Sequence, residues 1–225
     1  MIEHVYRRTA AARAIRSVIV ATDDERICRA VRAFGGEARM TSAAHVSGTD
    51  RIAELAAVLD CDLIVNVQGD EPLIEPEMID EAVAPFAFDP SLQMSTLRRR
   101  LDDRAEADNP NVTKVVVDRA DFALYFSRAA IPFVRGGCPP ARAWRHVGLY
   151  VYRRDCLRRL AALPPTEMER SEALEQLRAL EHGIRIKAVE TTFDSIGVDT
   201  PEDLARVRAI FAAHPAVEPD AQPSR

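Results

Sequence analysis

Residues 62–72, with the sequence DLIVNVQGDEP, constrain the fold more than any other part of the chain. The segment begins with a short apolar and β-branched run, which is typical of a strand buried on both faces of a parallel sheet. Gly69 and Pro72 then end the strand. Asp70 lies between them, at the carboxyl end of a predicted central strand, where open α/β sheets bind their ligands. A carboxylate at this position is a suitable oxygen ligand for Mg²⁺ bound to a nucleotide phosphate.

A second interpretation of the same segment needs no ligand. In it, Asp70 caps the helix predicted to begin near Glu75, while Gly69 and Pro72 are ordinary turn residues. The pattern alone leaves both interpretations open, although the loops between strands and helices carry function disproportionately often in this fold class.

The composition indicates a cytoplasmic protein with a substantial core. The 225 residues are enough for one large domain, or for one domain with a small appendage. No apolar run approaches the roughly 20 residues that a membrane span needs, and the charged N-terminal stretch does not resemble a secretory signal. The net charge of −5 argues against a general nucleic-acid binder, which would need a basic face. The four cysteines form no Cys-x-x-Cys pair, so neither a zinc site nor a redox motif is expected.

Predicted strands and helices alternate along the first part of the chain, which predicts an α/β fold with a mostly parallel, Rossmann-like sheet. Strands are predicted at residues 18–20, 37–41 and 63–67, and helices at 1–13, 24–34, 50–59 and 75–86. Residues 91–155 form a mixed-strand subregion, with strands expected at 94–101, 113–118, 122–126 and 147–152. Helices at 153–162 and 167–182, a strand at 184–190, a strand ending near Gly197 and a helix at 201–213 follow. We therefore expect one α/β domain over residues 1–213 and a flexible tail over 214–225.

Seven short segments carry a resemblance to a known enzyme family. They are ATDD at 21–24, SGTDR at 47–51, VNVQGDEP at 65–72, YFSRAAIP at 125–132, RHVGLY at 145–150, LEQLR at 174–178 and GVDTP at 197–201. Together they closely resemble 3-deoxy-manno-octulosonate cytidylyltransferase, also called CMP-Kdo synthetase, in register from Met1 to about residue 211.

The resemblance implies a cytosolic, usually homodimeric enzyme of lipopolysaccharide biosynthesis. Such an enzyme couples CTP with the eight-carbon acid sugar Kdo, using Mg²⁺, and yields CMP-Kdo and pyrophosphate. It also implies a three-layer nucleotidyltransferase sheet with helices on both faces, and a small antiparallel subregion for dimerisation and sugar binding.

Within this resemblance, Asp70 and Asp199 are the catalytic and metal-binding pair. Both are expected at carboxyl ends of strands, where they would hold one or two Mg²⁺ ions against the α-phosphate of CTP. The reaction itself is an in-line attack on that phosphorus, which depends mainly on positioning and charge neutralisation. Taken alone, Asp199 also fits the cap region of the last helix.

Ser47, Gly48 and Arg51 match the part of the family that recognises the cytosine end of CTP. The same residues also fit a turn that enters the helix predicted at 50–59, with Thr49 or Asp50 as its cap. Both roles can hold together, because a tight glycine turn exposes backbone groups to the edge of a base.

Arg128 is expected to bind the carboxylate of Kdo, because a guanidinium group binds a carboxylate with two parallel hydrogen bonds. The other residues that the resemblance places at the sugar are Gln68, His146, Tyr150, Glu175 and Gln176. For His146 and Tyr150 the alternative is a polar pair on a buried or dimer-facing strand.

Two departures from the family pattern leave alternatives open. The family normally opens with a strand and a Pro-Ala-Arg loop, followed by a second Arg and a Lys that bind the triphosphate. This chain starts just after that loop, which suggests either a translation start assigned too far downstream or a truncated, non-catalytic relative. The smaller departure is Ala44, where the family commonly has Asp before His45. Transfer of the cytidylyl group to another acidic sugar is the remaining alternative.

Overall fold

The computed structural model describes residues 1–45, 47–136 and 142–213, and the predicted flexible tail at 214–225 lies outside them. The chain divides into two compact units. Unit 1 comprises Met1–His45, Val67–Asp80 and Asp194–Arg225, and unit 2 comprises Val46–Asn66 and Glu81–Phe193. None of the described helices combines the length and the apolar character that crossing a membrane requires.

Unit 1 contains a small parallel sheet with its helices. Its elements are α1 (Ile2–Ala11), β1 (Ile19–Thr22), α2 (Glu25–Ala33), β2 (Glu37–Met40) and α9 (Pro201–Ala213). The two strands pair in parallel from Ile19 opposite Glu37 onward. The helix between them begins where the side chain of Asp24 accepts a hydrogen bond from the backbone of Arg26, so that a free amide at the helix start is satisfied. It ends next to Gly35, whose φ of 81° is a conformation that glycine adopts readily.

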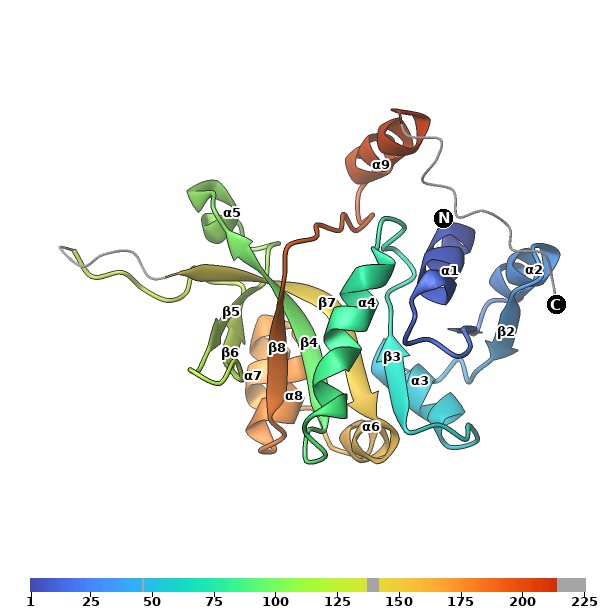
Figure 1. Cartoon of the computed structure of the whole chain (residues 1–225), viewed down its shortest axis with the longest axis horizontal. Helices are drawn as coiled ribbons and strands as arrows, with labels where there is room; N and C mark the ends of the chain where they lie inside the picture. Colours follow the sequence, from blue (N-terminus) through green and yellow to red (C-terminus); the bar gives the residue numbers. More distant parts are fainter. Residues whose placement is uncertain (46, 137–141, 214–225) are drawn as a thin grey trace. The chain divides into compact units, whose positions relative to one another are not determined.

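Unit 2 is built on a six-stranded sheet (Figure 1). Its strands are β3 (Leu63–Asn66), β4 (Met94–Leu101), β5 (Lys114–Val117), β6 (Ala123–Ser127), β7 (Ala143–Arg153) and β8 (Ile186–Thr191). Its helices are α3 (Gly48–Ala56), η1 (Ala84–Ala87), α5 (Arg104–Asp108), α6 (Arg154–Ala161), α7 (Glu167–Glu172) and α8 (Gln176–Glu181), and α4 (Pro76–Val83) crosses the boundary between the units. The strand order is β6-β5-β7-β4-β8. Strand β3 pairs with the last part of β7, from Tyr150 to Arg153, whereas β5 pairs with its first part, at Trp144 and Arg145.

The long strand β7 organises this sheet. Its 11 residues pair antiparallel with β3, β4 and β5, whereas β4 and β8 pair in parallel. Because β3 and β4 both run opposite to β7, they are parallel to each other, as the alternation of strand and helix predicted. They are not neighbours, however, because β7 lies between them. The α/β class is confirmed, but the pairing in the described residues is mixed rather than mostly parallel.

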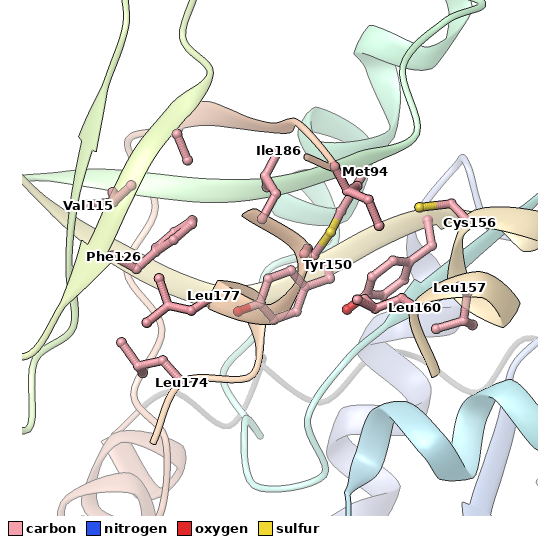
Figure 2. Close-up of a cluster of buried hydrophobic side chains, with 14 of the residues drawn as sticks. Met94, Val115, Phe126, Tyr150, Cys156, Leu157, Leu160, Leu174, Leu177 and Ile186 are labelled. Atoms are coloured by element: carbon pink, nitrogen blue, oxygen red, sulfur yellow. The ribbon is translucent and has the colours of Figure 1, made fainter. Parts of the chain in front are cut away.

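The main core of unit 2 lies between its sheet and helices α6 to α8. Figure 2 shows the apolar side chains that meet there, including Phe126, Leu157 and Leu177, which are fully buried. Tyr150 of β7 lies among them, with its ring between the side chains of Leu177 and Leu160 in this view (Figure 2). Burial of large apolar side chains is the main stabilising contribution in such a core, and truncating one of them to alanine typically costs about 2–5 kcal/mol.

Two local predictions are corrected by the structure, and one element was missed. The helix predicted at 167–182 is two helices, because Ala173 adopts the left-handed conformation with φ 51° and interrupts it. A bidentate ion pair between Arg178 of α8 and Glu169 of α7 holds the two pieces together. The strand expected to end at Gly197 is absent, since residues 192–199 contain neither helix nor strand. The short helix α5 was not predicted.

Candidate functional site

Asp70 lies in a loop of unit 1 that α1 supports. The guanidinium of Arg8 donates a hydrogen bond of 2.7 Å to the carbonyl oxygen of Ile74 and forms an ion pair of 2.6 Å with Glu75. At the other end of the helix, a Cβ atom added to Gly69 would lie 3.7 Å from the side chain of Ile2. Arg8 therefore holds the loop at Ile74 and Glu75, and Ile2 lies beside it at Gly69.

The segment that carries Asp199 is bound directly to this loop. The backbone N–H of Val198 donates a hydrogen bond of 2.9 Å to the carbonyl oxygen of Asp70. The hydroxyl of Ser195 donates to the carboxylate of Glu71, and a Cβ atom on Gly197 would lie 3.4 Å from the same carboxylate. Two acidic residues separated by more than a hundred positions are thus brought together, as predicted. Asp199 reaches this position from an irregular segment and not from the end of a strand.

Asp70 does not cap a helix, so its alternative interpretation is wrong, whereas Asp199 lies directly before the cap of the last helix, in the cap region that its alternative interpretation named. The last helix has its own cap, in which the Thr200 hydroxyl and the Asp203 carboxylate each accept a hydrogen bond from the other's backbone N–H. Helix α4 begins at Pro76, six residues beyond Asp70, which is too far for a capping side chain to reach. The pair is left available for a ligand.

The electrostatics of this pair favour a cation. Burial raises the pKa of Asp70, and the negative charge of Asp199 raises it further. A divalent cation would relieve both effects by neutralising the two carboxylates. No cluster of three or more His, Cys, Asp or Glu side chains suited to a metal occurs in the described ranges, so the described residues would offer a cation here two carboxylates at most. That donor set fits Mg²⁺, which commonly takes one or two carboxylates and completes its shell with phosphate oxygens and water.

The residues predicted to recognise cytosine lie at the start of α3 in unit 2. Ser47 is the cap of this helix, since its side chain accepts a hydrogen bond of 3.2 Å from Asp50. The expectation that Thr49 or Asp50 is the cap is wrong, and the Thr49 hydroxyl instead donates to Glu175 at 2.6 Å. Gly48 faces open space, because a Cβ atom added there would meet nothing within 4 Å. Arg51 follows on the first turn of the same helix.

Three of the predicted sugar residues line one small cavity of unit 2, which we call the Tyr150 pocket. It has a volume of about 20 Å³ and is lined by Thr49, Met94, Tyr150, Tyr152, Leu160, Glu175, Gln176 and Arg178. Gln176 is only 6% exposed, and within the described part of the chain its amide nitrogen has no hydrogen-bond partner. A buried donor without a partner is rare in folded proteins and indicates a place for a ligand or a water molecule.

His146 adjoins this pocket through the ring of Tyr150. The two ring centres are 5.4 Å apart, and the ring of Phe126 packs edge-on against His146 from 5.0 Å. Burial and the neighbouring Arg145 lower the pKa of His146 to about 3, so its ring is neutral at physiological pH. Burial raises the pKa of the Tyr150 hydroxyl, which therefore keeps its proton. The two rings are thus in contact, with Tyr150 buried and His146 half-buried.

Arg128 is bound by several backbone carbonyl groups of unit 2. Its guanidinium donates to the carbonyl oxygens of Glu172 at 2.8 Å, Pro110 at 3.2 Å and Ala173 at 3.5 Å. A guanidinium group has five N–H donors, so these contacts leave one donor on each terminal nitrogen. Arg128 does not line the Tyr150 pocket. These two remaining donors can still bind a ligand.

Lys114 is a residue of this region that the sequence analysis missed. It is fully buried, and its ammonium group donates to the carbonyl oxygens of Asn109 at 2.8 Å and Arg128 at 2.5 Å. Burial lowers its pKa. The signal was a lone charged residue at the start of an apolar, β-branched strand, where an unpaired lysine would be unfavourable.

Gln68 is exposed in unit 1, two residues before Asp70.

Comparisons with known proteins extend these observations. The cytidylyltransferase family model matches residues 1–186. Proteins named 3-deoxy-manno-octulosonate cytidylyltransferase are similar over most of their length. The one from Pelobacter propionicus is 56% identical over 95% of this chain and 88% of its own, and that from Geobacter metallireducens is 56% identical over 92% and 85%.

Among solved structures, CMP:2-keto-3-deoxy-manno-octonic acid synthetase complexed with CTP superimposes with a TM-score of 0.90 at 43% identity, covering 95% of this chain and 88% of its own. A putative glucose-1-phosphate thymidylyltransferase from Bacillus anthracis has a TM-score of 0.63 at 16% identity, covering 99% and 84%. The second likeness bears on the fold alone.

Proposed function

Because this chain belongs to the 3-deoxy-manno-octulosonate cytidylyltransferase family, we propose that it transfers the cytidylyl group of CTP to 3-deoxy-D-manno-octulosonate (Kdo), giving CMP-Kdo and pyrophosphate. The observation that supports this most strongly is the Asp70–Asp199 pair. The hydrogen bond from Val198 to Asp70 joins the two segments that carry these carboxylates, and the charge of Asp199 acts on Asp70, which supports a shared divalent cation.

In the proposed reaction, the anomeric hydroxyl oxygen of Kdo forms a bond to the α-phosphorus of CTP. The bond from this phosphorus to the bridging oxygen of the β-phosphate breaks, pyrophosphate leaves with the electron pair, and the hydroxyl proton passes to solvent. Asp70 and Asp199 hold Mg²⁺, which supplies positive charge to the phosphate oxygens when it is bound. The protein's other contribution to catalysis is to position the substrates, because in-line phosphoryl transfer depends on the alignment of the two substrates.

The substrates are assigned to residues as follows. Ser47, Gly48 and Arg51 recognise the cytosine end of CTP, for which the open space at Gly48 leaves room. The remaining donors of Arg128 bind the carboxylate of Kdo. The hydroxyl groups of the sugar are bound by Gln68, His146, Tyr150, Glu175 and Gln176.

Family membership also suggests the cellular setting. We propose that the chain acts in the cytoplasm as a homodimer, and that its product serves lipopolysaccharide biosynthesis.

The test is an assay of the purified protein with CTP and Mg²⁺ and with a panel of acidic sugars that includes Kdo, an amino analogue of Kdo and a sialic acid. We expect pyrophosphate release and a CMP-sugar product with Kdo, at a higher kcat/KM than with the other sugars. Higher turnover with sialic acid would contradict the choice of substrate, and absence of turnover with every sugar would contradict the transferase itself.

A further inference from the structure

We infer that Thr96 is a positioning residue that fixes His146 as the tautomer protonated on Nε2, so that Nδ1 accepts a hydrogen bond from a hydroxyl group of the sugar. The second half of this inference rests on the proposed function, because it takes the molecule bound beside Tyr150 to be a sugar. The first half concerns the protein alone and can be measured without any ligand.

The inference starts from the surroundings of a fully buried hydroxyl group. Thr96 lies in β4 at the point where the register between β4 and β7 shifts. Its Oγ1 is 2.8 Å from the carbonyl oxygen of Leu149, 3.2 Å from that of Val147 and 2.9 Å from Nε2 of His146. One hydroxyl group thus faces three potential partners.

Counting protons decides the direction of each bond. A threonine hydroxyl has one proton to donate and two lone pairs. The carbonyl oxygens of Val147 and Leu149 can only accept, so the proton of Thr96 goes to them. A lone pair of Oγ1 then faces His146, and a bond of 2.9 Å requires the proton to be on Nε2.

The protonation of the second ring nitrogen, Nδ1, follows from the charge of the ring. The groups that pack against it are the aromatic rings of Phe126 and Tyr150, and the nearest charge that acts on it is the cation of Arg145, which disfavours a second proton. A neutral ring with its proton on Nε2 has a lone pair on Nδ1. Among the described residues, none donates a hydrogen bond to this atom. His146 therefore presents an acceptor to a ligand, and no donor.

This assignment defines which groups of the site donate hydrogen bonds to a ligand and which accept them. The buried amide nitrogen of Gln176 needs an acceptor, and Nδ1 of His146 needs a donor. A sugar can supply both, because each hydroxyl group donates and accepts. A site that binds a hydroxyl in this way discriminates strongly against an analogue lacking it, since its own polar groups are then left without partners.

The first experiment records the ring nitrogen signals of His146 by ¹⁵N NMR in the ligand-free protein at neutral pH, and H146Q identifies which signals belong to it. We expect an Nε2 signal typical of a protonated ring nitrogen and an Nδ1 signal typical of an unprotonated one. T96V, which keeps the shape but removes the hydroxyl group, should shift both signals toward a mixture of tautomers, whereas T96S should keep the pattern of the natural protein. An unprotonated Nε2 in the natural protein, or unchanged signals in T96V, would overturn the assignment. If T96V fails to fold, the spectrum of the natural protein still decides it.

The second experiment measures steady-state kinetics with Kdo and CTP. T96V should raise KM for Kdo about five- to tenfold with little change in KM for CTP, as expected for the loss of one neutral hydrogen bond, and T96S should restore it. An unchanged KM for Kdo in a T96V protein whose tautomer has shifted would overturn the contact with the sugar and leave the tautomer assignment standing. Should the natural protein make no CMP-Kdo, the proposed function fails, and the NMR result still decides the role of Thr96.

Discussion

The Asp70–Asp199 pair of unit 1 consists of two acidic side chains that are at least partly accessible to solvent, whereas the Tyr150 pocket of unit 2 is small and includes the hydrogen-bonded pair Thr49 and Glu175. The two carboxylates repel each other and are positioned by backbone contacts, of which the bond from Val198 to Asp70 is the most direct. In the pocket, Thr49 donates to Glu175, and Gln176 alone keeps a buried polar atom without a described partner. The first region needs its ligand to become electrostatically favourable, while the second is largely preorganised by the protein.

This difference predicts opposite effects of mutation on activity and on stability. In unit 1, removing a charge should abolish turnover without harming the fold. In unit 2, most changes should affect both.

The largest effect is expected for D70N. It should lower kcat by about 10²–10³-fold or more, because the proposed Mg²⁺ would lose one of its two carboxylate ligands. Since the pKa of Asp70 is raised in the folded protein, its carboxylate opposes folding at pH values above that pKa. The variant should therefore melt, without Mg²⁺, at the same temperature as the natural protein or at a higher one. E77Q, which removes an exposed carboxylate of α4, is the matched control and should keep full activity. Full turnover of D70N would remove this residue from the metal site.

K114M should lower the free energy of unfolding by about 1–3 kcal/mol, because the carbonyl groups of Asn109 and Arg128 lose their buried donor. It should also raise KM for Kdo, since the backbone of Arg128 is no longer held. The control is K187M, whose ammonium group is bound at an exposed site and whose loss should cost less than about 1 kcal/mol. Urea denaturation of both variants measures the difference, and equal effects would show that the burial of Lys114 has no special role.

The lowered pKa of His146 should be visible in the pH dependence of the free energy of unfolding. Its pKa is about 3 in the folded protein and about 6.5 in the unfolded chain, so between these values the unfolded chain binds more protons. The contribution of His146 to the free energy of unfolding is therefore largest above pH 6.5. It falls as the pH is lowered toward 3, by up to about 1.4 kcal/mol per pH unit. H146Q should lose this part of the slope. Parallel stability curves for the two proteins from pH 7 to pH 5 would contradict the buried, neutral ring.

Q176M should change the free energy of unfolding the least of these variants, and it should raise it where K114M lowers it. Methionine has a similar shape and removes a buried donor that has no described partner, so the free energy of unfolding should rise by about 1 kcal/mol. KM for Kdo should rise at the same time, if that donor binds the sugar. A lower melting temperature would indicate that the amide group is already satisfied in the free protein.

The fold was predicted well where the signal is local and poorly where it depends on distant partners. The strand predicted at 94–101 is β4 over those residues, and the helix predicted at 24–34 is α2 with its ends shortened by one residue each. The insertion of β7 between β3 and β4 has no local signal, because a strand does not encode its neighbour. Nor does the left-handed conformation of Ala173, which an alanine adopts only when its surroundings impose it.

The candidate site shows the same division. The meeting of Asp70 with Asp199 was expected from the family resemblance, whereas residue patterns alone left capping roles open. Thr96 and Lys114 were missed because their partners are backbone carbonyl groups of other strands and turns, which a sequence pattern does not display. Arg128 was predicted to bind the carboxylate of the sugar, but its three contacts with carbonyl groups could not be anticipated from its type.

The central claim is that Asp70 and Asp199 hold the same divalent cation, and a double-mutant cycle of metal binding tests it most directly. Mn²⁺ replaces Mg²⁺ as the probe, and its binding to the protein in the presence of CTP is followed by electron paramagnetic resonance for the natural protein, D70N, D199N and the double variant. We expect each single variant to bind Mn²⁺ at least about tenfold more weakly, and the double variant to bind little more weakly than either, because both side chains act on one ion. Unchanged Mn²⁺ binding in the single variants, or losses that add fully in the double variant, would contradict the account.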